Sequence, residues 1–200
     1  MTSVTESLSN HDSSGHVAPE TKERQFHMSV LLLLGSDVVF VAALVFAYLY
    51  LRELNVDHMW RPAYVHPVGL VSQGAVALLM IVSLACYQSG RAAMRRGSQS
   101  GLVAGIALAL VFVAAELAWQ LHQMAVVQFG PQSGAYASSY FALAGYHVFH
   151  LVLLLLLGAA ILNRARLGRF NGARGIEVTN VGYLWTWVTI MAIIMVVLPN

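Results

Sequence analysis

Cysteine and charge are both scarce in this sequence. Its 200 residues include one cysteine, Cys86, which lies inside an apolar run. A single thiol excludes an internal disulfide, a CxxC redox pair, a multi-thiolate zinc site and an iron–sulfur cluster. Charged residues make up 10% of the chain, the formal net charge is +2, and the basic residues fall in short clusters between apolar runs. We therefore expect no nucleic acid among its partners.

Hydrophobic residues dominate the composition instead. They make up 58% of the chain, with a mean hydropathy of +0.67, whereas soluble proteins average roughly 45–50% apolar and about 25% charged residues. This composition indicates an integral membrane protein. The first 27 residues are polar and net acidic, without the basic start and short apolar core of a cleaved signal. We expect residues 1–27 to remain as a flexible tail ahead of a membrane domain at 28–198.

Five apolar stretches are long enough to cross a bilayer as α-helices, which takes about 20 residues each. The stretches are 28–51, 67–88, 101–127, 138–162 and 180–198. They predict an all-α fold, an integral membrane bundle of five transmembrane helices. The loops between them are too short for a separate soluble domain. Gly101 and Gly105 match the small-residue spacing at which membrane helices pack closely.

The basic residues predict the orientation, because positive charge is disfavoured on the translocated side. Of the 11 Lys and Arg residues, only Arg52 and Arg61 lie in the first and third loops. The others lie in the tail, the second loop and the fourth loop: Lys22, Arg24, Arg91, Arg95, Arg96, Arg164, Arg166, Arg169 and Arg174. We expect a cytoplasmic N-terminus and an external C-terminus. Aromatic residues near the span ends are candidates for the membrane interfaces: Tyr48, Tyr50, Trp60, Tyr64, Tyr136, Tyr140 and Tyr183.

Few ionisable side chains fall inside the predicted spans. They are Asp37, Glu116, His122, His147 and His150. A charge at the centre of a membrane helix costs at least ~2.5–3.5 kcal/mol on insertion scales, so these groups are the first candidates for function. Asp37, Glu116, His147 and His150 fall near the middle of their spans by the helical rise per residue. Asp37 has no basic partner on its own helix.

Two polar stripes are predicted to meet. Glu116, Gln120 and Gln123 recur at i, i+4 and i+7 and share one helix face, and His147 and His150 share a face of the next helix. We expect Glu116 near one of these histidines, where a shared proton avoids a bare charge. The functional interpretation is a proton relay or a lipid-headgroup site. The structural interpretation is a hydrogen-bonded pair that fixes helix packing.

The histidines limit which cofactors this chain can bind. Five of the eight lie in or beside the tail or in the first loop: His11, His16, His27, His58 and His66. The remaining three are too few for the two haems and copper of an oxygen-reducing centre, so this chain cannot itself be an oxygen-reducing subunit. The spacing of His147 and His150 is weak evidence for a metal site, and we predict none. A bis-histidine haem has only His122 with His147 or His150 available. The tryptophans in apolar context, Trp119, Trp185 and Trp187, are interpreted as packing or interfacial residues.

Short motifs between Trp119 and Leu151 resemble subunit III of the haem–copper respiratory oxidases, in its five-helix bacterial form. They are Trp119-Gln120-Leu121-His122-Gln123, Phe129-Gly130-Pro131, Ser133-Gly134, Ser138-Ser139-Tyr140-Phe141 and Gly145-Tyr146-His147-Val148-Phe149-His150. The last is similar to the family's Gly-aromatic-His-x-x-His signature. Gly35-Ser36-Asp37-Val38-Val39-Phe40 resembles the motif that opens the family's five-helix core. The resemblance covers nearly all of residues 26–200.

This resemblance implies an accessory role in aerobic respiration. Subunit III of that family has no redox centre, packs against the catalytic subunit, holds phospholipids and supports proton uptake. The implied partners are subunits I and II of a cytochrome c or quinol oxidase in the bacterial inner membrane, with the haems and copper in the catalytic subunit and structural phospholipid on this chain. Asp37 matches the family's intramembrane acid, and His147 and His150 match its histidine pair. Glu116 is a further candidate site residue, on the basis of its predicted depth in the membrane alone.

The last predicted span departs from the family pattern. Where the family typically has Trp-His-x-x-Asp, this chain has Trp185-Thr186-Trp187-Val188-Thr189. Three other interpretations stay open. One is a subunit-III-like protein that accompanies nitric oxide reductases. The others are a small b-type membrane cytochrome and a stand-alone proton or small-solute transporter.

Overall fold

The computed structural model describes residues 19–55, 60–170 and 175–198. These residues form five α-helices: α1 (Pro19–Leu54), α2 (Leu70–Arg95), α3 (Gln99–Val126), α4 (Ala135–Arg166) and α5 (Ile176–Val197). Each helix is long and apolar enough to cross a membrane, which confirms the all-α prediction and the number of candidate spans. The predicted tail up to residue 18, together with His11, His16, His58, Arg174 and the side chain of Lys22, lies outside the described residues.

Most helix ends lie beyond the apolar stretches that predicted them, although α2 begins later, at Leu70 rather than at residue 67. α1 begins at Pro19 rather than at residue 28, and α2 ends at Arg95 rather than at residue 88. The added turns contain Glu, Gln and Arg, which favour helix nearly as well as apolar residues do. An apolar run measures the segment that suits lipid, and the hydrogen-bonded helix continues into the polar sequence beside it.

Glycines end the two helices that run into the basic turns. Gly97 after α2 has φ +78° and Gly168 after α4 has φ +66°. The N–H of the residue after each glycine donates to the carbonyl of Ala93 (3.0 Å) or Arg164 (3.1 Å). This is the Schellman pattern, in which a left-handed residue after the helix lets its last carbonyls find donors.

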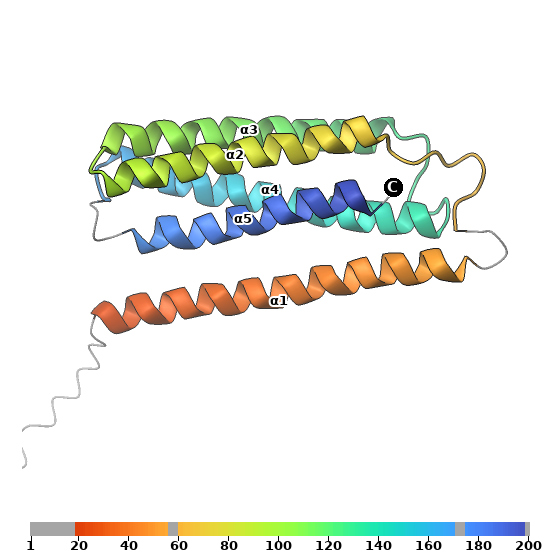
Figure 1. Ribbon diagram of the computed structural model, residues 1–200, viewed down its shortest axis with the longest axis horizontal. Helices are drawn as coiled ribbons and strands as arrows, with labels where there is room; N and C mark the ends of the chain where they lie inside the picture. Colours follow the sequence, from red (N-terminus) through yellow and green to blue (C-terminus); the bar gives the residue numbers. More distant parts are fainter. Residues whose placement is uncertain (1–18, 56–59, 171–174, 199–200) are drawn as a thin grey trace, which may run out of the picture.

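Helices α2, α3, α4 and α5 form a bundle, and α1 lies along one side of it (Figure 1). The closest approach joins α2 and α3, where a Cβ atom on Gly105 would lie 2.5 Å from the Cα of Gly90. The predicted use of Gly101 and Gly105 in close packing is confirmed, since a Cβ atom on Gly101 would lie 2.6 Å from that of Ala93. The bundle core is apolar and includes Met80, Ile106, Leu154 and Trp185.

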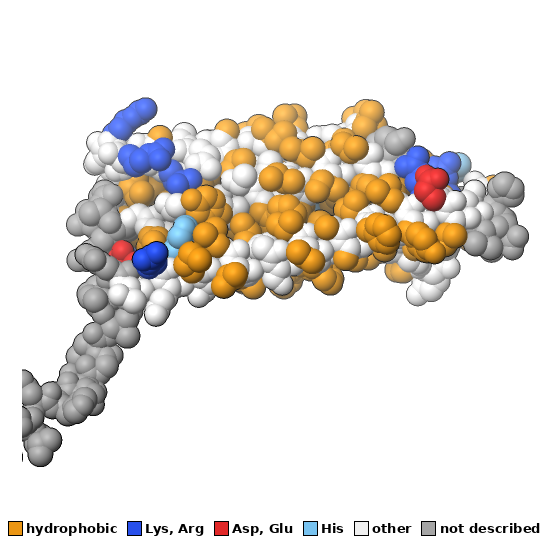
Figure 2. All heavy atoms as spheres, turned by 60° about the horizontal axis from the view of Figure 1, so that its bottom comes forward, with side chains coloured by type: hydrophobic (Ala, Val, Ile, Leu, Met, Phe, Trp, Pro, Cys, Tyr) orange, Lys and Arg blue, Asp and Glu red, His pale blue; other side chains and the backbone are white. Residues whose placement is uncertain are grey.

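Helix α1 is peripheral. Among the described helices it contacts only α4 and α5. In its most apolar 18-residue window 6% of the residues are buried, against 33–39% in the other four helices. Apolar side chains cover the middle of the face in Figure 2, and Lys and Arg side chains gather toward its two ends. This distribution suits a lipid-facing surface bounded by two polar interfaces.

Three of the predicted interfacial tyrosines are buried inside the bundle instead. Tyr48, Tyr136 and Tyr140 form an aromatic cluster with Trp60 and Phe129. The loop before α2 makes this possible, because it folds back onto the helix ends. The N–H of Tyr136 donates to the Trp60 carbonyl (3.0 Å), and the Tyr136 hydroxyl accepts from the N–H of Val68 (3.3 Å). Tyr50, Tyr64 and Tyr183 are exposed, and their place at a membrane interface stays a prediction.

Candidate functional site

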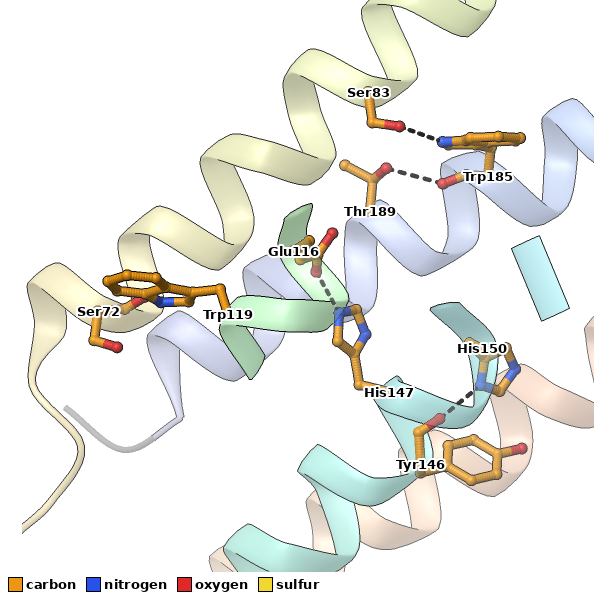
Figure 3. A network of polar contacts seen from close by, with 9 residues as sticks. All are labelled: Ser72, Ser83, Glu116, Trp119, Tyr146, His147, His150, Trp185 and Thr189. Carbon is orange, nitrogen blue, oxygen red and sulfur yellow. Dashed lines mark hydrogen bonds and ion pairs between the residues drawn. The ribbon is translucent and has the colours of Figure 1, made fainter. Parts of the chain in front are cut away.

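Helix α4 places two histidines against two different carboxyl groups. His147 reaches Glu116 on α3, and His150 reaches Asp37 on α1. The three-residue spacing between the histidines turns the second side chain about 60° around the helix from the first, toward α1. Figure 3 shows His147 directed at Glu116 and His150 directed away from it. α4 therefore lies between an inner pair, Glu116–His147, and an outer pair, Asp37–His150.

The inner pair is completely enclosed. Nε2 of His147 lies 2.7 Å from Oε1 of Glu116, and both side chains have 0% exposure. This confirms the predicted meeting of the two stripes. Oε2 of Glu116 and Nδ1 of His147 are buried and have no hydrogen-bond partner among the described residues. One shared proton makes the pair neutral overall, which avoids burying a bare charge.

The outer pair has a full set of partners. Nε2 of His150 lies 3.0 Å from Oδ2 of Asp37. The hydroxyl of Tyr146 donates to Oδ1 of Asp37, and Nε1–H of Trp187 donates to Oδ2. The side chains of His150 and Asp37 are 4% and 14% exposed, so this pair lies nearer the surface than the inner one. Three helices, α1, α4 and α5, meet at this carboxyl group.

The hydrogen bonds of His150 indicate which of its ring nitrogens donates to the backbone. Nδ1 lies 2.9 Å from the Tyr146 carbonyl, and a carbonyl only accepts, so Nδ1 carries a hydrogen. The contact between Nε2 and Asp37 then requires one proton on either the imidazole or the carboxyl group. Both arrangements leave the pair with zero net charge. A proton can therefore pass between the two groups without creating an unpaired charge in the membrane.

Sequence reasoning missed two of the groups around Asp37. Tyr146 was quoted only as part of a motif, and Trp187 was interpreted as a packing or interfacial residue. One signal could have found Trp187: an indole N–H deep in a membrane span needs an acceptor. Asp37 was the one intramembrane acid without a predicted partner.

Comparison with known proteins finds no matching family model. Cytochrome c oxidase subunit 3 of Synechocystis is 26% identical over 170 residues, covering 84% of this chain and 72% of that protein. Cytochrome c oxidase subunit 3 of Corynebacterium diphtheriae is 25% identical over 197 residues, covering 94% of each chain. The chain is a distant homologue of cytochrome c oxidase subunit 3. The homology is nearly full length, and with five candidate spans the chain is a multi-pass membrane protein.

In this subunit 3 homologue, Thr186 and Thr189, which stand where the family pattern has His and Asp, bond within their own helix. Thr186 donates to the Gly182 carbonyl (2.9 Å) and Thr189 to the Trp185 carbonyl (2.8 Å). Such local bonds satisfy a hydroxyl without a partner on another helix. The polar links from α5 to α1 come instead from Trp187 and from Asn180, whose Oδ1 lies 2.6 Å from Nδ1 of His27.

Subunit 3 proteins typically lack redox centres of their own, and the side chains present here do not fit a bis-histidine haem. His122 is exposed and lies against the ring of Trp119. The Nε2 atoms of His147 and His150 are held by carboxyl groups. Within residues 19–55, 60–170 and 175–198, three or more His, Cys, Asp or Glu side chains never gather in a metal-binding arrangement.

The two glutamines of the polar stripe lie one and two turns from Glu116. Gln120 is buried and Gln123 is half-buried. Both line a pocket between the helices rather than bonding to the Glu116–His147 pair. The predicted stripe thus divides into a carboxyl group that meets a histidine and two amides that face a pocket.

Proposed function

We propose that this chain is an accessory subunit of a proton-translocating haem–copper terminal oxidase, bound to its catalytic subunit I and to subunit II. The observation that carries the proposal is the contact between Asp37 and the segment Tyr146–His150. These residues lie in two of the motifs that resemble the oxidase family, far apart in the sequence and joined in space. The near-full-length homology to cytochrome c oxidase subunit 3 supports the same role.

In this role the chain contributes proton-holding groups and no redox centre. The Asp37–His150 pair, slightly exposed and neutral overall, accepts and releases a proton near the partner surface and so supports proton uptake by the catalytic subunit. Tyr146 and Trp187 position the carboxyl group. The Glu116–His147 pair, enclosed between α3 and α4, holds a second proton. Haems and copper belong to the catalytic subunit.

The proposed surroundings follow from charge and exposure. The described arginines at the end of the bundle where α1 begins are Arg24, Arg91, Arg95, Arg96, Arg164, Arg166 and Arg169, against Arg52 and Arg61 at the other end. The positive-inside rule then gives a cytoplasmic N-terminus in the bacterial inner membrane. Structural phospholipid and the catalytic subunit cover the exposed apolar face of α1.

Affinity purification through a tag on this chain tests the proposal. The expected result is a complex with a larger partner that contains haem and copper, while the chain alone shows no visible absorbance. A Soret band from the isolated chain would favour a small b-type cytochrome. Recovery with a partner that contains haem and non-haem iron but no copper would favour a nitric oxide reductase. Recovery of the chain alone, without pigment, would favour a stand-alone transporter.

A further inference from the structure

Two neighbouring pockets open between the helices at the end of the bundle where α2 and α4 begin. Each has a cavity volume of about 10 Å³, which is room for about one water molecule, and the two share Gln73, Tyr140 and Met195 in their linings. The first is also lined by Gln120 and Gln123 from the polar stripe of α3. Helices α2, α3, α4 and α5 all contribute side chains to this first pocket.

Gln73 is a buried polar side chain that lines both pockets. It is 6% exposed, and both its amide nitrogen and its amide oxygen are buried without a hydrogen-bond partner among the described residues. The hydroxyl of the neighbouring Ser72, which also lines the first pocket, is buried and unpartnered as well. Buried polar groups in folded proteins are nearly always hydrogen-bonded, so these atoms require a ligand that both donates and accepts.

The chemistry of the lining identifies that ligand as neutral and small. Amides, hydroxyls and apolar side chains line both pockets, and every lining residue is uncharged. Neither an anion nor a metal cation finds a compensating charge there. Water both donates and accepts, fits irregular polar cavities between helices, and needs two to four polar neighbours, which the amides and hydroxyls provide.

Polar side chains of the pocket lie on the same helix faces as the inner pair. Gln120 lies one helical turn from Glu116 on α3, a rise of about 6 Å, and Tyr140 lies two turns from His147 on the matching face of α4. Oε2 of Glu116 and Nδ1 of His147 are the next buried polar atoms without a partner along these faces. On α4, the buried apolar residues Leu143 and Ala144 lie between Tyr140 and His147, so the shortest polar path from the pocket to the inner pair runs along α3, from Gln120 to Glu116.

We propose that these two pockets form a hydrated vestibule, with about one water molecule in each, which brings water from the end of the bundle at the start of α2 and α4 to Gln120, one helical turn from Glu116. Gln73 and Gln120 hold the innermost water. The vestibule reduces the distance between water and the enclosed pair to about one helical turn. This property belongs to the chain itself, so it goes beyond the proposed oxidase role and does not depend on a partner subunit.

Thiol accessibility tests the vestibule in the full chain, reconstituted in phosphatidylcholine vesicles. Cys86→Ala removes the native thiol, and Gln120→Cys places a new one in the pocket. Leu121→Cys is the matched control, because Leu121 is the next residue of the same helix and is exposed on the apolar outer surface. The probe is Ag⁺, which travels in water and binds thiolate. Thiols left unreacted are labelled with a maleimide after denaturation and counted by mass spectrometry.

We expect Ag⁺ to block Gln120→Cys at least about tenfold faster than Leu121→Cys, because thiolate forms where water is present and not in lipid. Adding Gln73→Leu should slow the reaction of Gln120→Cys, whereas Gln73→Asn, which keeps an amide, should preserve it. If Gln120→Cys does not fold, Gln123→Cys replaces it as the pocket reporter. Equal rates at the pocket and control positions, or no effect of Gln73→Leu, would overturn the proposal. Neither outcome would affect the oxidase assignment, which rests on co-purification.

Discussion

Nε2 of His150 in α4 lies 3.0 Å from Oδ2 of Asp37 in α1, and this contact anchors a helix that is otherwise mostly exposed. Two further polar contacts hold α1 at its ends. His27 bonds to Asn180, and Arg52 donates to the Leu198 carbonyl (3.3 Å). The same group that we propose to hold a proton thus also fastens α1 to the bundle. Variants at this site must separate these two roles.

The Asp37→Asn variant removes the proton-holding group and keeps its shape. An amide can still bond to Tyr146 and Trp187, so we expect the complex to assemble with nearly normal yield. Without a shared proton at His150, proton uptake or the lifetime of the complex during turnover should fall several-fold. The check is oxygen consumption and proton release by the purified complex over repeated turnovers. If steady-state and long-term activity both equal those of the wild type, the proton role of Asp37 is wrong.

Removing one partner of the inner pair should destabilise the protein more than removing both. His147→Leu leaves Glu116 buried without its partner, a change that typically costs roughly 3–5 kcal/mol. In the double variant Glu116→Leu with His147→Leu, most of this loss should be recovered, because apolar residues of similar size are tolerated. Thermal unfolding in detergent measures all three proteins. Unchanged yield and stability of His147→Leu would leave the pair without a structural role.

Removing the indole N–H groups of Trp185 and Trp187 in α5 should affect stability in both cases and activity in only one. Trp187→Phe deletes the donor to Asp37, and Trp185→Phe deletes the donor to the Ser83 hydroxyl (2.9 Å). Each loss should destabilise the fold by roughly 1–3 kcal/mol. Only Trp187→Phe should also lower proton uptake by the oxidase complex. Equal activity of the two variants would mean that Trp187 does no more than hold the helices together.

The crossing of α2 and α3 should not accept a methyl group. In Gly105→Ala the new Cβ atom would lie 2.5 Å from the Gly90 backbone, so the helices must separate. We expect a loss of roughly 1–3 kcal/mol, as for other overpacked sites. Gly145→Ala on α4 is the control, since its Cβ atom would meet no atom within 4 Å. Denaturant or thermal unfolding compares the two. A Gly105→Ala protein as stable as the control would contradict the close crossing.

Sequence periodicity predicted the helices and one of the two carboxyl contacts. Spacing along α3 and α4 placed Glu116 and His147 on facing stripes, because consecutive antiparallel helices pack side by side. The same reasoning did not find the partners of Asp37. His150, Tyr146 and Trp187 come from helices that neighbour α1 only through the tertiary fold, and helix spacing does not define which helices are neighbours.

The position of aromatic side chains at the helix ends was also only partly predictable. Tyr48 and Tyr136 have the amphipathic rings typical of membrane interfaces, and hydropathy places them there. The loop around Trp60 covers this end of the bundle, so the rings pack on one another instead. Loop conformation depends on turns that an apolar pattern does not describe.

Depletion and reconstitution test the central claim most directly. The chain is removed from the purified oxidase complex and added back as wild type or as Asp37→Asn. Oxygen consumption is then followed through many turnovers at constant pH. Our account predicts that the depleted complex loses activity progressively, that the wild-type chain restores it, and that the Asp37→Asn chain binds without restoring it. A depleted complex that keeps full activity and normal proton release would contradict the account.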